Sequence, residues 1–170
     1  NLLIEELTFS FLDLNLKLNK ISFMFTFFCI IVFIISANMF DGTNLQSSSF
    51  FIFILIYISI TNLNLNIFCI FLVVSIIFFS IKNLKGKTFL GDGGSYLLSF
   101  ILAYMLILTH KYTNIKSDEI AILIIFPIID TLRLYFLRII NKKNPFLPDT
   151  NHFHHIVKKK FSNLFSILII

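Results

Sequence analysis

Three polar stretches carry the side chains of this apolar chain that could do chemistry. The stretch "PFLPDTNHFHHI" holds His152, His154 and His155, and Asp149 precedes them. Histidine titrates near neutral pH and can act as an acid, a base or a donor to phosphate. By itself the stretch has three interpretations: a solvated loop, a phosphate-handling cluster, or a zinc site. The zinc interpretation lacks cysteine partners and the helical i, i+4 spacing.

The stretch "KTFLGDGGS" places Asp92 among three glycines and directly before an apolar run. Glycine lets the backbone approach a ligand closely, and the N-terminus of a helix attracts phosphate. A carboxylate at that point suits Mg²⁺, which prefers carboxylate and phosphate oxygens. The simpler interpretation is that Asp92 only caps the helix that follows.

The stretch "ANMFDGTNLQ" repeats a polar side chain at every third position, at Asn38, Asp41 and Asn44. Such a group could bind a polar ligand. Asparagine and aspartate are also common where a helix ends, and Gly42 permits a tight turn there. The stretch alone does not decide between two interpretations, a binding site and a helix terminus.

A further pair of charges lies inside an apolar run near the end of the chain. Asp130 and Arg133 are three residues apart and can pair on one helical face, just beyond Pro127, which should kink the helix. Ionisable groups inside a membrane helix are candidates for function. A structural ion pair near the membrane surface explains them equally well.

The elements that must position these residues are membrane helices. Hydrophobic residues make up 57% of the 170 residues and charged residues 14%, whereas soluble domains average about 25% charged. We therefore predict an all-α, polytopic membrane helix bundle forming a single membrane domain. Its five full apolar segments and the start of a sixth are Ile21–Ala37, Leu45–Thr61, Leu65–Ile81, Gly93–Thr109, Ile120–Ile140 and a run from Phe161.

The less apolar stretch Asn1–Lys20 could form an interfacial hairpin or a short helix. Cys29 and Cys69 lie inside apolar runs without CxxC spacing, so we interpret them as small buried hydrophobic residues.

Counting helices places the polar stretches on one side of the membrane. Alternating spans deliver Ala37–Ser49, Lys82–Ser95 and Asn141–Lys160 to the same face, and most of the lysines lie in these three segments. Lysine and arginine accumulate on the cytoplasmic side of membrane proteins. We therefore expect these loops to be cytoplasmic.

Together the three stretches resemble the C-terminal half of the polyprenyl-phosphate N-acetylhexosamine-1-phosphate transferases. "NMFDG" resembles the latter part of that family's NAxNxxDGxDGL, "KTFLGDGGSYLLSF" resembles FxGDxGSxxLGF, and "PFLPDTNHFHHI" resembles PFxxDRxHxHH. The resemblance runs from about Leu14 to the end. The chain departs from the pattern at Ile35, at Asn44-Leu45-Gln46 in place of Asp-Gly-Leu, and at Thr150 in place of arginine.

The resemblance implies a reaction at a bacterial inner membrane. N-acetylhexosamine-1-phosphate would pass from a UDP-N-acetylhexosamine to polyprenyl (undecaprenyl) phosphate, releasing UMP, as the first membrane step of a cell-envelope glycan. Mg²⁺ would be the cofactor. The membrane and these two substrates are the expected partners, with a homodimer as a candidate assembly and no nucleic acid.

The resemblance also assigns roles to residues. Asn38 and Asp92 would ligate Mg²⁺. The catalytic group would be Asp92, Asp41, His152, His154 and His155. The substrate-binding group would be Asn44, Asn83, Phe89, Gly91 and Asp149, with uracil stacked on Phe89, and apolar grooves between helices would hold the polyprenyl tail.

Two rival functions remain open at this point. A transporter or metal-handling membrane protein would explain Asp130 and the histidines, and an inactive family remnant would retain the motifs without activity. The family's upstream DDxxD motif has no match in these residues, since Glu5-Glu6 is a poor one. We therefore interpret the chain as the C-terminal fragment of a larger transferase and expect it not to catalyse transfer alone.

Overall fold

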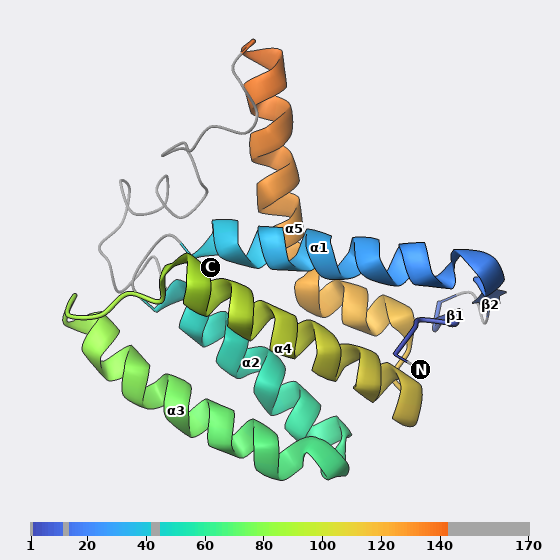
Figure 1. Cartoon of the computed structure of the whole chain (residues 1–170), viewed down its shortest axis with the longest axis horizontal. Helices are drawn as coiled ribbons and strands as arrows, with labels where there is room; N and C mark the ends of the chain where they lie inside the picture. The colour runs from blue at the N-terminus through green and yellow to red at the C-terminus, as the bar shows by residue number, and fades with distance from the viewer. Residues whose placement is uncertain (1, 12–13, 42–44, 143–170) are drawn as a thin grey trace.

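The chain folds as a helical membrane bundle with a small strand hairpin at one end (Figure 1). The computed structural model describes residues 2–11, 14–41 and 45–142. Its helices are α1 (Ser22–Phe40), α2 (Gln46–Thr61), α3 (Asn66–Leu84), α4 (Gly91–Tyr112) and α5 (Ser117–Ile140). The predicted all-α polytopic class is confirmed. The run from Phe161 lies outside the described residues.

Within the described residues, four helical segments are long and apolar enough to cross a membrane, namely 19–40, 63–84, 91–112 and 117–140. The first two join α1 and α3 to the short 3₁₀ helices η1 (Asn19–Ile21) and η2 (Leu63–Leu65) that precede them. Helix α2 has only 16 residues, fewer than the roughly 17–25 that a span requires. Five full spans were expected, so α2 is the exception.

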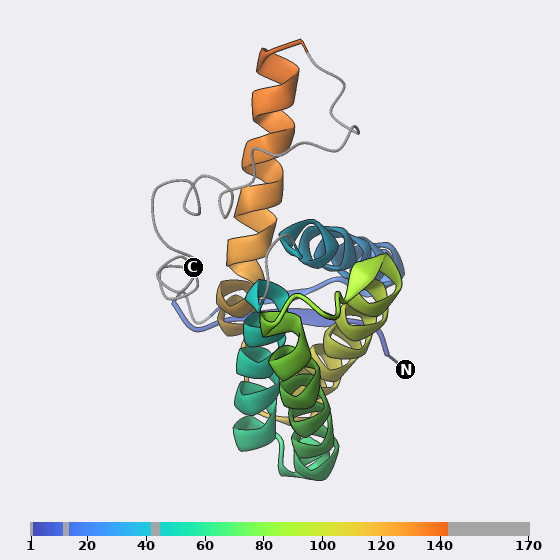
Figure 2. The ribbon, with the colours of Figure 1, turned by 90° about the vertical axis from the view of Figure 1, so that its left-hand side faces the viewer.

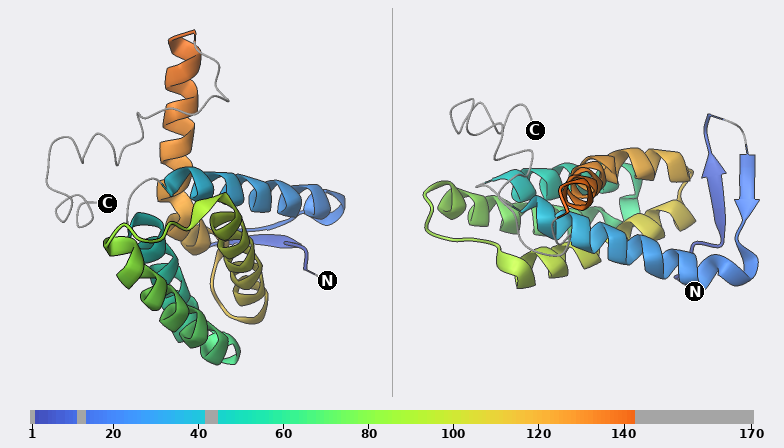
Figure 3. Two further views of the ribbon diagram at one scale, coloured as in Figure 1. Left: turned by 60° about the vertical axis from the view of Figure 1, so that its left-hand side comes forward. Right: turned by 90° about the horizontal axis from the view of Figure 1, so that it is seen from above.

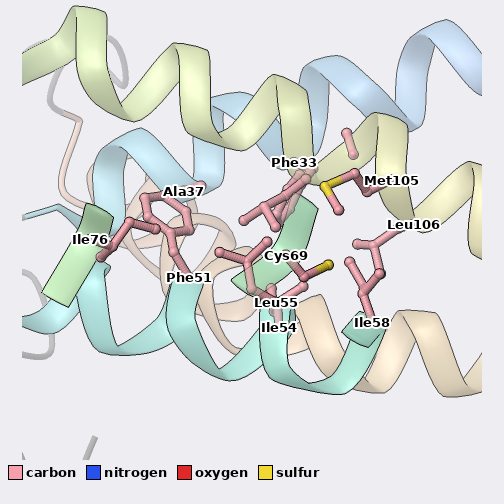
Figure 4. Packing of buried hydrophobic residues seen from close by; sticks show 12 residues of the cluster. Phe33, Ala37, Phe51, Ile54, Leu55, Ile58, Cys69, Ile76, Met105 and Leu106 are labelled. Carbon is pink, nitrogen blue, oxygen red and sulfur yellow. The ribbon is translucent and has the colours of Figure 1, made fainter. Parts of the chain in front are cut away.

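The core lies where α1, α2, α3 and α4 converge (Figure 4). Phe51, Ile54 and Ile58 project from α2 and are fully buried, and they meet Phe33 of α1 and Met105 of α4. Cys69 of α3 is buried in the same cluster, as the sequence predicted. Cys29 is only partly buried. One face of α2 is therefore buried in protein, while Phe53 and Ile60 on its other face are exposed.

The first residues form the hairpin rather than a short helix. Strands β1 (Glu6–Phe9) and β2 (Leu14–Lys17) pair antiparallel, with Glu6 opposite Lys17. The hairpin is fastened to the start of α5, where the Ser10 backbone N–H donates to the Asp118 carboxylate at 2.9 Å. It therefore closes the end of the bundle at which α1 and α5 begin (Figure 3).

Helix α5 bends sharply and its second half stands away from the bundle (Figure 2). Pro127 lies within the helix and cannot donate the backbone hydrogen bond of a regular turn, as predicted. Beyond it, Arg133 Nη2 donates to Asp130 Oδ1 at 2.8 Å. The predicted Asp130–Arg133 pair is therefore formed, on the part of α5 that leaves the bundle.

The opposite end of the bundle gathers the polar loops. Helices α1 and α3 end there, and α2 and α4 begin there (Figures 1 and 3). The expectation that the polar stretches around Asp41 and Asp92 lie at one end of the bundle is therefore confirmed. This end carries two of the three polar stretches, and the third lies outside the described residues.

Candidate functional site

The site is centred on a contact between the last turn of α1 and the first turn of α4. Asn38 Nδ2 donates to Ser95 Oγ at 2.6 Å and to Asp92 Oδ1 at 3.2 Å. Ser95 is fully buried, and its hydroxyl donates in turn to the Asp92 backbone carbonyl at 3.1 Å. With its nitrogen held by two acceptors, the amide of Asn38 directs its oxygen away from α4.

Asp92 does not act as the N-cap of α4. The residue at the cap position is Leu90, which makes no capping bond through its side chain, and Asp92 lies in the first helical turn with its side chain exposed. Gly91 has φ +64°, a conformation that other residues rarely adopt. The Asp92 carboxylate is therefore presented at a helix N-terminus, where the backbone N–H groups favour bound anions.

Asp41 lies immediately after α1, at its C-cap, so the helix-end interpretation holds for its position. Its carboxylate nevertheless accepts a hydrogen bond from the buried Ser47 hydroxyl at the start of α2. Burial raises the pKa of Asp41, the Ser47 bond opposes that rise, and the charge of Asp92 adds to it. Two carboxylates are therefore close enough to repel, an arrangement that a cation would stabilise.

Asn83, near the end of α3, is buried and joins two loops of the site. Its Oδ1 accepts a hydrogen bond from the Leu45 backbone N–H at 2.7 Å, and its Nδ2 donates to the Thr88 carbonyl at 2.7 Å. Leu45 has a left-handed backbone conformation, with φ 68°. The sequence predicted a substrate contact for Asn83 and did not anticipate these bonds.

The loop between α3 and α4 presents an aromatic ring and positive charges to solvent. Phe89 is 74% exposed, two residues before Gly91. Lys85 and Lys87 are exposed on the same loop, and Lys82 is exposed in the last turn of α3. An exposed ring beside basic side chains can stack a base and attract a phosphate-bearing ligand.

The structure brings together most of the predicted site residues that it describes. Asn38, Asp41, Asp92, Phe89 and Gly91 lie at one end of the bundle. Asn44, Asp149, His152, His154 and His155 lie outside the described residues, so their roles stay predictions. Sequence reasoning missed Ser95 and Ser47, although Ser95 is part of the quoted motif. Serines inside apolar helices are easily taken for packing residues.

The oxygen donors of the site fit a small hard cation. Two carboxylates, Asp41 and Asp92, and the Asn38 amide are of the type that Mg²⁺ uses when substrate phosphates complete its coordination. Among residues 2–11, 14–41 and 45–142, no group of three His, Cys, Asp or Glu side chains is placed to hold a metal. A site built there would therefore need the amide and an anionic ligand.

An apolar cavity of about 460 Å³ lies toward the hairpin end of the bundle. Its walls come from α1, α4 and α5, including Phe33, Leu106 and Ile124, and His110 and Asp118 also line it. This is an apolar space between helices of the kind the sequence predicted. It belongs to the half of the bundle opposite Asp92.

The fold and the site define the class of the protein. It is a multi-pass membrane protein with two carboxylates and an amide at one end of its helical bundle. The family model described as glycosyl transferase family 4 matches residues 1–110, and the chain belongs to this family. The resemblance drawn from the three motifs is thereby confirmed. No solved structure matches the chain.

The chain is also similar to bacterial proteins named undecaprenyl-phosphate alpha-N-acetylglucosaminyl 1-phosphate transferase. It is 28% identical to the Escherichia coli O157:H7 protein over 94% of this chain and 47% of that one. It is 29% identical to the Salmonella typhi protein over 85% and 43%. A Haemophilus influenzae protein is 33% identical over 51% and 26%. The chain spans about half the length of the first two relatives, or less.

Proposed function

We propose that the protein acts in the Mg²⁺-dependent transfer of N-acetylhexosamine-1-phosphate from a UDP-sugar to undecaprenyl phosphate at the inner membrane. An oxygen of the lipid phosphate would attack the sugar-bearing phosphorus, the bond between the two phosphates of the donor would break, and UMP would leave. The observation that carries this proposal is the joining of Asn38 to Asp92, because it unites two family motifs on one face of the bundle. The names of the relatives support the substrate class.

The described residues have distinct tasks in this reaction. Asp92 and Asn38 would hold Mg²⁺, with Asp41 nearby, and the bound ion would neutralise charge on the diphosphate. The N–H groups at the N-terminus of α4 would favour the same anion. Phe89 would stack the uracil. The α3–α4 loop would lie on the cytoplasmic side, and its exposed lysines would attract the negatively charged UDP-sugar.

The remaining roles are those that the family resemblance implies. His152, His154 and His155 would contact phosphate and polarise the transfer, with Asp149 and Asn44 on the substrate side. The polyprenyl tail would lie along apolar surfaces such as those of α1 and α5. Because transfer brings two anions together, the main catalytic contribution expected of the site is electrostatic.

Transfer of radiolabel from UDP-N-acetylglucosamine into lipid tests the proposal. The protein is expressed from its complete reading frame, and membranes receive undecaprenyl phosphate with MgCl₂ or with a chelator. We expect labelled lipid and UMP only with Mg²⁺ and with intact Asp92. Absence of labelled lipid with every UDP-hexosamine tried would favour an inactive family remnant, and uptake of a solute without lipid labelling would favour a transporter.

A further inference from the structure

Asn83 makes contacts that a substrate-binding side chain would not be expected to have. It is 6% exposed, and both ends of its amide are bonded to backbone groups, each at 2.7 Å. Buried amides that are fully bonded within the protein have little capacity left for a ligand. In place of the expected substrate contact, we propose that Asn83 is a positioning residue that fixes the two loops of the site relative to each other.

The first loop is fixed through Leu45. Its backbone N–H donates to Asn83 Oδ1, and its carbonyl accepts the Ser49 N–H as the first turn of α2 forms. Two residues later, the Ser47 hydroxyl donates to Asp41. Since leucine rarely adopts a φ of 68°, the Asn83 bond also holds Leu45 in a conformation that it would otherwise leave.

The second loop is fixed through Thr88. Asn83 Nδ2 donates to the Thr88 carbonyl, and Phe89, Gly91 and Asp92 follow within four residues. The side chain of Asn83 therefore spans the gap between the segment that carries Asp41 and the segment that carries Asp92. These segments are far apart in the sequence, and besides Asn83 the Asn38–Asp92 bond also joins them. Their separation sets the spacing of the two carboxylates.

The end of α3 is itself held firmly enough to act as this support. The Gly86 N–H donates to the Asn83 carbonyl at 2.9 Å, and the Lys87 N–H donates to the Lys82 carbonyl at 3.1 Å. Gly86 has φ +64°, the conformation that commonly ends a helix. The backbone of Asn83 is thus fixed by the helix end, while its side chain is left to join the loops.

The functional consequence rests on the proposed transferase activity. If the carboxylates must keep their spacing for the reaction, loss of the Asn83 bonds lowers turnover without removing any group that touches substrate. Displacements of about 1 Å in such sites can lower rates by about 10²-fold. A lost nucleotide contact would instead raise the KM for the UDP-sugar with a smaller change in turnover.

The test compares Asn83→Leu, Asn83→Asp and Asn62→Leu in protein expressed from its complete reading frame and reconstituted in nanodiscs. Asn62 is a matched control, since it is buried at the other end of α2 and its side chain donates a long bond of 3.5 Å to Thr109 Oγ1. Amide hydrogen exchange of segments 45–50 and 84–90 is measured together with kcat, the KM for UDP-N-acetylglucosamine and the Mg²⁺ concentration for half-maximal rate.

We expect Asn83→Leu to speed exchange at both segments by about tenfold or more and to lower kcat by about 10–100-fold. Asn83→Asp keeps the acceptor for Leu45, so only the 84–90 segment should exchange faster. Asn62→Leu should lower the Tm while leaving kcat and these segments unchanged. If Asn83→Leu cannot be purified in a folded state, Asn83→Asp tests the proposal by itself. Faster amide exchange in segment 84–90 alone supports the positioning role of Asn83.

Unchanged exchange in both Asn83 variants would overturn the proposal. So would faster exchange with only the KM for UDP-N-acetylglucosamine raised, because that pattern indicates a direct nucleotide contact. If the wild-type protein transfers no sugar phosphate to any lipid, the proposed function fails. The exchange comparison then still decides whether Asn83 positions the loops.

Discussion

Asn38 and Asp92, 54 positions apart in the chain, are joined by a hydrogen bond of 3.2 Å from the Asn38 amide nitrogen to the Asp92 carboxylate. The bond closes α1 onto α4 at the end of the bundle where the polar loops gather. It leaves the second carboxylate oxygen of Asp92 and the amide oxygen of Asn38 as donors for a cation.

Replacing Asp92 with asparagine should abolish most transfer while the protein still inserts and folds. Asparagine can accept the Asn38 bond, but it lacks the charge that a divalent cation requires. Loss of one electrostatic stabiliser typically lowers rates by about 10²–10³-fold. Lipid labelling is measured across a Mg²⁺ titration, with the amount of folded protein followed by gel filtration in detergent. Near-normal labelling would show that Asp92 has only a structural role.

Replacing Ser95 with alanine should lower activity by releasing the amide of Asn38. The Ser95 hydroxyl is the closer of the two acceptors that orient this amide, so its loss lets the oxygen and nitrogen exchange places. We expect turnover to fall by about tenfold or more and the Mg²⁺ requirement to rise.

Ser99→Ala is the control for that variant. Ser99 is equally buried one turn further along α4, but its hydroxyl bonds only to a carbonyl of its own helix. Its replacement should leave the Mg²⁺ requirement unchanged. Equal effects of the two substitutions would mean that Ser95 contributes only to packing.

Replacing Asp41 with asparagine should reduce activity without reducing stability. The pKa of Asp41 is raised, chiefly by burial, so its ionised form destabilises the folded state. This destabilisation is absent below the ordinary pKa of about 4 and complete above the raised pKa. Asp41→Asn should therefore have an equal or higher Tm than the wild type at neutral pH, measured without divalent cations. The difference should vanish in acid, and a Tm that is lower at neutral pH would contradict this reasoning.

Position 45 should tolerate glycine better than valine. Leu45 adopts a left-handed backbone conformation, which costs a non-glycine residue about 1–2 kcal/mol and is worst for β-branched side chains. Both substitutions shorten the partly buried side chain, but only glycine relieves the strain. In thermal unfolding, Leu45→Val should have a lower Tm than Leu45→Gly. The reverse order would show that loss of side-chain packing matters more than relief of backbone strain.

The α3–α4 loop and the strand hairpin should be reached from opposite sides of the membrane. Lys87 and Asn15 are exposed at the two ends of the bundle. With Cys29 and Cys69 replaced by alanine, cysteines at these positions are tested with an impermeant maleimide. We expect labelling of Asn15→Cys in intact spheroplasts and of Lys87→Cys only after permeabilisation. Labelling of both from outside would exclude the proposed orientation.

The sequence by itself determined the helices and the side on which the polar loops gather. Long apolar runs must satisfy their backbone hydrogen bonds internally, so five helices were predicted close to their observed bounds. Because each span reverses the direction of the chain, the motifs around Asp41 and Asp92 had to share one face. Each motif alone left a helix end, a cap or a solvated loop open, and the anion and cation site followed from the resemblance of the three motifs together to one family.

Only the tertiary structure decided which side chains meet and which serve as supports. The family resemblance predicts a ligand contact for Asn83, and the structure adds a bond from its amide to Leu45, 38 positions away. The sequence predicts no hydrogen-bonding role for Ser47 and Ser95, whose partners lie 6 and 57 positions away. A local pattern cannot tell whether a polar side chain faces a ligand or a backbone group of another loop. That choice follows from how α1, α3 and α4 pack around α2, which depends on the shapes of many apolar side chains at once.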